Sequence, residues 1–382
     1  MGNSEVLTTA EIRKLNCEKI FAYIYQSRRT SKQTIAQVMG LSMPTVTQNL
    51  KVLEHLGLIE RNGFYESTGG RKAQMIHCIQ DARIAIGAAV LQEGLSLCAV
   101  GLCAQIIKEE QHPLPFQNTD RYYREVGRLV TAFAGGLPYP SDRILGIGIA
   151  IQGLVSPDGE QVIYGSILQN TGTTRQSFQA HLPFPCRLLH DTDAAAAAEF
   201  WHNEELRDAV YLVLNRNLGG ALVIGGEIRC GWGIIEHMTL VPGGKPCYCG
   251  RLGCAEAYCS ANSLRQASGL PFELFFQQLR AGNAKCAALW EDYLRSLAQA
   301  VDNIRMLVNC PFMIGGFLQQ FMTEEDFRLL TRFVEELTSF PEFPVSFVQG
   351  RHGCRASMLG AAICYVDAFL KNIDPVQEPE RL

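Results

Sequence analysis

Four residues in one short stretch have the types and spacing of metal ligands. His237 is followed by Cys247, Cys249 and Cys254, which form a Cys-x-Cys-x4-Cys pattern among several glycines. Three thiolates and one imidazole satisfy tetrahedral Zn²⁺ with no open position, so we predict a structural zinc ion that clamps a loop. The alternatives are four buried side chains without metal, or a redox pair at Cys247 and Cys249, although the loop lacks a Cys-x-x-Cys helix start.

The carboxylate of Asp191 stands where ligands bind in α/β proteins. It follows the apolar residues Leu188 and Leu189 and precedes a helix predicted from Asp193 to Trp201. Ligands in such folds bind at the carboxyl ends of strands, where a carboxylate can hold hydroxyl groups or act as a base. The alternative for Asp191, and for Glu256 further along, is helix capping or a surface ion pair.

Three short helices are predicted before residue 57, and the third could read DNA. Asn16, Ser31 and Ser42 can each cap one helix, and Gly40 permits a tight turn between the second and the third. Two helices joined in this way, with Thr, Gln and Lys exposed on the second, are typical of a helix-turn-helix. Gln can pair with adenine, and Lys reaches bases or phosphate. The side chains of this helix that we expect to contact DNA are Thr45, Thr47, Gln48 and Lys51.

A basic wing is predicted after these helices. Strands are expected over 58–61 and 73–79, with a turn at Asn62-Gly63 and a glycine-rich tip that ends in Arg71 and Lys72, which suit phosphate or minor-groove contact. Residues 1–75 contain ten Lys or Arg and six Asp or Glu, a net charge of +4, which leaves −8 for the rest of a chain whose total is −4. Any DNA contact is therefore expected on these first 75 residues. The alternative is a small helical module that binds protein.

The composition is that of a folded chain with two or three domains. Of 382 residues, 47% are hydrophobic and 19% are charged. No apolar run approaches the roughly 20 residues that span a bilayer, and the N-terminus lacks a signal core. We therefore expect a cytoplasmic protein without a membrane segment, whose fourteen cysteines are mostly thiols.

Strands and helices alternate from Ala82 onward. Two successive blocks, each a hairpin followed by further strands and helices, suggest duplicated α/β lobes. Strands are expected at 84–91, 95–100, 106–107, 144–151, 188–190, 210–214, 221–224 and 312–314, and helices at 119–135, 286–308 and 355–370.

Several motifs together resemble the ROK family (repressor, open reading frame, kinase). The stretches 41–47, 56–59 and 69–72 are similar to the DNA-binding domain of ROK repressors, and the Cys-x-Cys-x4-Cys pattern after His237 is similar to the family's zinc motif. The resemblance covers about 14–370. It implies an α/β fold, a two-lobed actin/hexokinase-like (ribonuclease H-like) domain preceded by a winged helix-turn-helix. The implied domains are 1–80, 81–189 with 355–382, and 190–354.

The resemblance also implies a sugar cleft. Asp191 matches the catalytic base of ROK kinases, but the surrounding Asn-Asp-Ala-Asn motif is changed, and the pair His190-Asp191 is closer to sugar-responsive repressors. A sugar-contacting Glu of the family is Ile234 here, while Glu236 is expected to point elsewhere. The implied sugar-binding residues are Asp191, His190, His237 and Glu256.

The phosphate-binding features of ROK kinases are degraded in this chain. Their first hairpin carries Asp-x-Gly-Gly-Thr, where this sequence has Ala89 to Glu93, and a Glu facing phosphates would repel them. Their second loop, Gly-Thr-Gly-x-Gly, retains only its last glycines.

The sequence thus predicts a regulator, not an enzyme, with Asp191 as a vestigial base. We expect operator DNA and a sugar or sugar phosphate as ligands, and a homodimer or homotetramer. The alternatives are an active ROK sugar kinase with an appended DNA-binding domain, and a regulator controlled by a partner protein.

Overall fold

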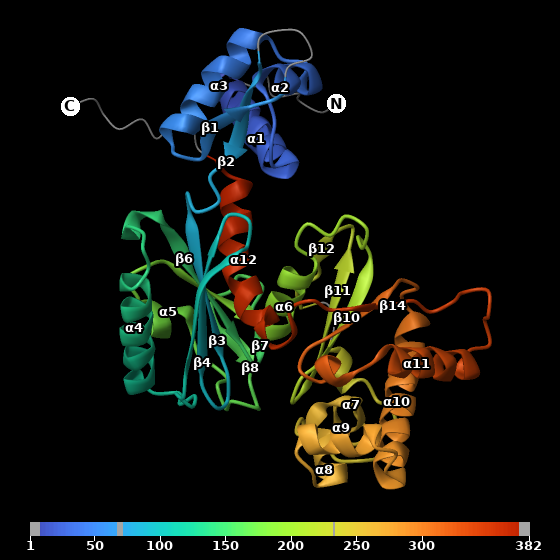
Figure 1. Ribbon diagram of the computed structural model, residues 1–382. Helices are drawn as coiled ribbons and strands as arrows, with labels where there is room; N and C mark the ends of the chain where they lie inside the picture. The colour runs from blue at the N-terminus through green and yellow to red at the C-terminus, as the bar shows by residue number, and fades with distance from the viewer. Residues whose placement is uncertain (1–7, 67–71, 232–233, 374–382) are drawn as a thin grey trace, which may run out of the picture.

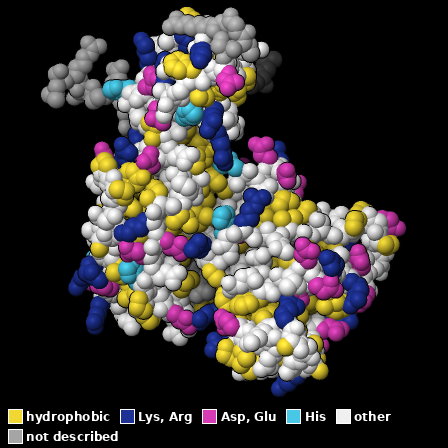
Figure 2. All heavy atoms as spheres, viewed as in Figure 1, with side chains coloured by type: hydrophobic (Ala, Val, Ile, Leu, Met, Phe, Trp, Pro, Cys, Tyr) yellow, Lys and Arg dark blue, Asp and Glu magenta, His cyan; other side chains and the backbone are white. Residues whose placement is uncertain are grey.

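A head and two lobes make up the computed structural model, which describes residues 8–66, 72–231 and 234–373 (Figure 1). The head holds the N-terminal helices and lies at one end of the molecule, above two lobes that stand side by side. Each lobe is built on a five-stranded sheet. Figure 2 shows the head as a narrower part above the wider body, with charged side chains of both signs on this face.

Side-chain caps begin the three helices of the head. Thr8 and Glu11 form a capping box, so the predicted start at Asn16 was wrong, because Asn16 lies inside the first helix. Ser31 and Ser42 cap the second and third helices as predicted. The helices are α1 (Thr9–Ser27), α2 (Lys32–Met39) and α3 (Met43–His55).

The wing is an antiparallel pair, β1 (Ile59–Phe64) and β2 (Gln74–Cys78). The predicted turn at Asn62-Gly63 was wrong, because both residues lie within β1. The register shifts there, and Gly63 has a φ of 79°, so the strand bends without ending. The tip at 67–71 lies outside the described residues.

The first lobe has the strand order β5-β4-β3-β6-β9. The predicted hairpin is confirmed as β3 (Ile84–Val90) and β4 (Leu95–Gly101). Because β3, β6 and β9 are parallel, their carboxyl ends meet at one edge of the sheet. The other elements are β5 (Ile106–His112), α4 (Asp120–Gly135), η1 (Ser141–Arg143), β6 (Ile144–Ile151), β7 (Leu154–Val155), β8 (Val162–Tyr164), α5 (Arg175–Gln179) and β9 (Cys186–His190).

The second lobe has the strand order β12-β11-β10-β13-β14, with β10, β13 and β14 parallel. Its longest helix ends at Arg305 rather than at the predicted Val308, and Leu307, just past its end, is 88% exposed. The elements are β10 (Ala209–Leu214), β11 (Leu218–Ile224), β12 (Glu227–Ile228), η2 (Ile235–His237), α7 (Glu256–Cys259), α8 (Ala261–Ser268), α9 (Phe272–Arg280), α10 (Ala284–Arg305), β13 (Phe312–Gly315), η3 (Leu318–Phe321), α11 (Glu324–Leu337) and β14 (Phe347–Gln349).

Two helices, α6 (Asp191–Glu199) and α12 (Ala356–Leu370, after η4 at Gly353–Arg355), lie between the sheets. The first begins at Asp191 rather than at the predicted Asp193. It packs against α12 and β11, and α12 packs against β3 and β6. Gly360 makes the crossing close, since a Cβ at Gly360 would lie 1.6 Å from the carbonyl oxygen of Ala194.

By length and composition, Gly353–Leu370 could cross a membrane, with a mean hydropathy of 1.2. No such segment was expected from the sequence. In the structure it includes α12, whose Met358, Leu359 and Ile363 are buried in the core between the sheets. Its apolar surface is therefore used for packing.

Replacing Gly360 with Ala should destabilise the fold, because the new methyl group would overlap the backbone of α6. We expect the free energy of unfolding, measured by urea denaturation, to fall by about 1–3 kcal/mol. The matched control is Gly135→Ala at the end of α4, where nothing lies within 4 Å. Equal stabilities of the two variants would contradict this account of the helix crossing.

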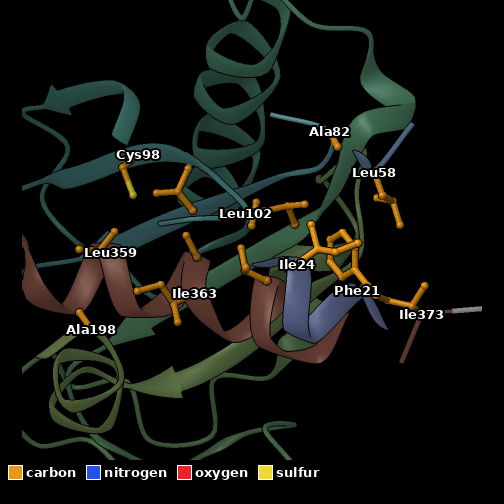
Figure 3. Packing of buried hydrophobic residues seen from close by; sticks show 14 of the residues in the cluster. Phe21, Ile24, Leu58, Ala82, Cys98, Leu102, Ala198, Leu359, Ile363 and Ile373 are labelled. Carbon is orange, nitrogen blue, oxygen red and sulfur yellow. The ribbon is translucent and has the colours of Figure 1, made fainter. Parts of the chain in front are cut away.

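The core of the head continues into the first lobe. Phe21 and Ile24 of α1 belong to one buried cluster with Leu102, Ile363 and Ile373 (Figure 3). The chain segments on either side of residue 80 therefore share apolar packing.

A polar contact also joins the head to the end of α6. The hydroxyl of Tyr25 in α1 donates to the carbonyl of Leu102 at 2.8 Å and lies 3.3 Å from Nε2 of His202. The Tyr25 and His202 rings are 5.2 Å apart, and His202 also packs against Trp201. Both His202 and Trp201 follow α6 directly, so this helix extends from Asp191 to the boundary of the head.

Candidate functional site

The four residues predicted to bind metal lie together. Their ligand atoms are all within 4.8 Å of one another. Cys247 Sγ lies 3.5 Å from His237 Nδ1, and Cys249 Sγ lies 3.7 Å from Cys254 Sγ. Two thiolates bound tetrahedrally at about 2.3 Å from Zn²⁺ would stand roughly 3.8 Å apart. The donor set and its spacing therefore fit a tetrahedral metal ion.

Backbone contacts of the loop bring these ligands together. His237 ends η2, and a bridge between Thr239 and Cys254 returns the chain to it. Arg251 donates to the carbonyl of His237 at 3.2 Å. Gly253 has a φ of 81°, and a Cβ there would lie 1.7 Å from the carbonyl oxygen of Val241, so only glycine fits. The loop then leads into α7, which begins with Glu256.

Glu256 holds the turn between β10 and β11. Its two carboxylate oxygens accept hydrogen bonds from Asn217 Nδ2 at 2.8 Å and from the Leu218 amide at 2.6 Å. The side chain is buried, and this burial raises the pKa of Glu256 to about 7. Glu256 also lines a hollow of about 380 Å³, together with Asn217 and Tyr248. The metal loop and the β10–β11 turn are thus fastened to each other.

Asp191 belongs to a partly buried group of acidic residues around one histidine. His190 Nε2 lies 3.3 Å from Asp191 Oδ1, and His190 Nδ1 lies 3.8 Å from Asp193 Oδ2. Burial would lower the pKa of His190, but the neighbouring carboxylates of Asp193, Asp191 and Glu236 raise it to about 9. Burial raises the pKa of Asp191. His190 thus lies between the two carboxylates at the start of α6.

Glu236 joins this group, contrary to the expectation that it points elsewhere. It is 7% exposed, and its charge acts on that of His190. Burial raises the pKa of Glu236 to about 7. Ile234, at the family's Glu position, is 45% exposed. The short η2 turn accounts for the difference, because it directs the side chain beside His237 inward.

A cavity of about 260 Å³ lies between the lobes. Asp191 lines it, with Gln152 from the first lobe and Asn217 from the second. Asn217 also lines the hollow that contains Glu256. The structure therefore brings Asp191 and His190 together, while Glu256 faces a separate hollow that shares only Asn217 with the cavity.

An ion pair across the lobes occupies the place of the degraded phosphate loops. Glu93, in the β3–β4 turn, pairs with Arg216 of the β10–β11 turn, and Nη2 donates to Oε2 at 2.6 Å. The glycines retained in the second loop have packing roles. A Cβ at Gly219 would lie 2.3 Å from Thr192 Oγ1, and one at Gly220 would lie 2.8 Å from Ile235 Cδ1.

The polar face of α3 is open to solvent. Gln48 and Lys51 are exposed, and with Thr47 and Lys32 they line one shallow surface groove. Val46, Leu50 and Leu53 are fully buried, so the predicted division of α3 into two faces is confirmed. Two threonine hydroxyls already have partners, since Thr45 Oγ1 lies 2.8 Å from Ser42 Oγ, and Thr47 Oγ1 donates to the Met43 carbonyl at 2.6 Å.

Basic residues of the wing lie next to this groove. Lys72 and Arg61 line a neighbouring hollow, and Lys32 of α2 lines both. Arg71 lies outside the described residues. Lys32 was missed from the sequence, although its position directly after the Ser31 cap places it at the start of a helix, where phosphate groups bind.

Residues 86–368 match the sequence profile of the ROK family. The chain belongs to the ROK family. This match covers both lobes, including the metal loop and the cavity.

ROK regulators are among the most similar proteins. The DNA-binding transcriptional dual regulator NagC of Escherichia coli K12 is 25% identical over 275 residues, which cover 69% of this chain and 67% of that protein. The xylose repressor of Caldicellulosiruptor bescii is 23% identical over 272 residues, with the same coverage.

Solved ROK structures share the fold. A ROK transcriptional regulator, a homologue of the E. coli MLC protein, superimposes with a TM-score of 0.77 at 19% identity and covers 96% of this chain and 98% of its own. A ROK glucokinase from Streptomyces griseus, in complex with glucose and AMPPNP, gives 0.63 at 18% identity and covers 74% of this chain and 98% of its own. The lobes thus have the ROK fold, and the regulator match extends over the head.

Proposed function

We propose that this protein is a DNA-binding transcriptional regulator that represses carbohydrate-metabolism genes in response to a sugar. One observation carries the proposal: a helix-turn-helix with Gln48 and Lys51 exposed is joined to a two-lobed body, as in the ROK regulator that covers 96% of the chain. The relatives support it, because they are named as repressors linked to N-acetylglucosamine and xylose. Such a protein acts in the cytoplasm.

The head would place α3 in the major groove of operator DNA. Thr45, Thr47, Gln48 and Lys51 would face the bases and phosphates, while Arg71 and Lys72 of the wing would contact the backbone. A homodimer or homotetramer would present two heads to a palindromic operator. A sugar that brings the lobes together would change the spacing of the heads and hence the affinity for DNA.

The metal loop would hold a structural zinc ion. His237, Cys247, Cys249 and Cys254 would be its four ligands, a set that leaves no position for substrate. When bound, the ion supplies a cross-link rather than chemistry. The residues it fixes include Glu256, which holds the β10–β11 turn at the edge of the cavity.

The cavity would bind the sugar without phosphorylating it. Asp191 would contribute a polar group directly, as a vestigial base, with His190 beside it, whereas Glu256 and His237 would act from the neighbouring metal loop by holding the β10–β11 turn. The ion pair between Glu93 and Arg216 supports the loss of kinase activity, because a carboxylate stands where a nucleotide's phosphates would need hydrogen-bond donors.

Changing Asp191 to Asn should separate sugar response from DNA binding. We expect the purified protein to bind an operator selected from a random DNA pool and to release it when the effector sugar is added. The Asp191→Asn variant should bind this DNA equally well but need at least about tenfold more sugar for release, since a charged hydrogen bond to a hydroxyl is lost. Fluorescence anisotropy measures both the affinity for DNA and the sugar concentration that releases it. The control is Asp292→Asn, at an exposed position of α10.

A coupled assay of ADP release decides between regulator and enzyme. We expect no turnover with common hexoses and amino sugars. Turnover that disappears in Asp191→Asn would favour an active ROK kinase with a DNA-binding head. If no sugar alters DNA binding or the melting temperature, control by a partner protein is favoured.

A further inference from the structure

The cavity between the lobes contains an aromatic wall as well as Asp191. Phe272, at the start of α9, and Phe317, just before η3, both line it. Their ring centroids are 5.0 Å apart in an edge-to-face arrangement. One cavity of about 260 Å³ therefore combines a carboxylate with two aromatic side chains.

Neighbouring aromatic residues hold this wall in place. Phe272 is 9% exposed, and Phe317 packs against Phe321 at 5.5 Å between ring centroids. Phe321 in turn stacks on Phe276. The rings are already held in place before a ligand arrives. Binding of a flat or apolar group against them therefore costs the protein little conformational entropy.

The charges in the cavity disfavour a phosphate. Arg216 is the cation among the lining residues, and both of its terminal nitrogens donate to Glu93. Asp191 adds a second carboxylate. A phosphate entering the cavity would face these two acids and would compete with Glu93 for Arg216, in an ion pair whose side chains are exposed to solvent. The remaining polar side chains that line the cavity are neutral: Gln92, Gln152, Asn215, Asn217 and Ser357.

We propose that this cavity binds a neutral glycoside, with the sugar ring at Asp191 and the attached ring against Phe272 and Phe317. The inference rests on the proposed function and names the effector class of the same cleft. A free monosaccharide would leave the aromatic wall uncovered. A sugar phosphate would bring its charge to Glu93 and Asp191.

Calorimetric titration of the full chain with matched probes tests this assignment. The probes are glucose, xylose and N-acetylglucosamine, their phenyl glycosides in both anomers, and the 6-phosphates of glucose and N-acetylglucosamine. We expect at least one phenyl glycoside to bind about tenfold or more tightly than its parent sugar. No 6-phosphate should bind more tightly than its parent.

Two leucine variants show whether the aromatic wall is responsible. Phe317→Leu should remove most of the gain in affinity that the phenyl group provides. Phe327→Leu is the matched control, because Phe327 packs against the same core but does not line the cavity. The Phe327→Leu variant should retain the full gain in affinity from the phenyl group.

The outcomes separate this inference from the proposed function. The glycoside assignment is overturned if no phenyl glycoside binds more tightly than its parent sugar, or if a 6-phosphate does. It is also overturned if Phe317→Leu weakens the binding of parent sugar and glycoside equally. If free sugars bind without any gain for glycosides, the sugar response stands and only the glycoside assignment fails. If no probe binds, both fail.

Discussion

A Cys254→Ser variant is expected to lose its zinc and much of its stability. Cys254 is fully buried, and it is the last ligand of the metal loop before α7 begins at Glu256. Without the fourth ligand, two thiols and an imidazole would remain close together with nothing to bind them. Loss of a structural metal is among the few single changes that cost several kcal/mol, so we expect the Tm to fall by roughly 5–15 °C.

Mass spectrometry of the metal content and a thermal melt check this result. Wild-type protein should carry about one zinc per chain, as a closed four-ligand site implies. Cys230→Ser is the matched control, because Cys230 is an exposed thiol of the same lobe. Freshly purified wild-type protein without zinc, or a Cys254→Ser variant that melts within about 2 °C of it, would refute the metal assignment.

Replacing Gln48 and Lys51 together by Ala should strongly weaken operator binding. The two exposed side chains make different contributions. Lys51→Ala alone should weaken binding to all sequences and lower the salt slope by about one, since one phosphate contact is lost. Gln48→Ala alone should relax the preference at one base pair by about 1–3 kcal/mol. The double variant should combine the two losses, with weaker binding to every sequence and a smaller preference for its operator over unrelated DNA.

Anisotropy titrations at several salt concentrations separate these effects. Lys285→Ala removes an exposed lysine of α10 in the second lobe, and it should leave both the affinity and the salt slope unchanged. Operator binding that survives the double change would show that α3 is not the reading helix.

The sequence predicted elements whose signals are local. Ser31 and Ser42 cap their helices as expected because a cap depends on the next three residues, and the β3–β4 hairpin pairs neighbouring strands. The start of α1 was misplaced because Asn16 competed with the stronger capping box of Thr8 and Glu11. The turn at Asn62-Gly63 was misplaced because a glycine with positive φ can also bend a continuing strand.

The candidate site was predicted in part for the same reason. The metal ligands lie within eighteen positions of one another, so their spacing already indicated a cluster. The pair of Glu93 and Arg216 joins residues 123 positions apart, and only the packing of the two lobes brings them together. Glu236 was misjudged because alternation along an extended chain would point it away from His237, whereas η2 turns it inward.

Helix α6 connects the cavity with the head. At nine residues it is about 13 Å long, and it carries Asp191 at one end, while His202, just past the other end, meets Tyr25. A ligand that displaced α6 would therefore reach α1 of the head through the contact between His202 and Tyr25.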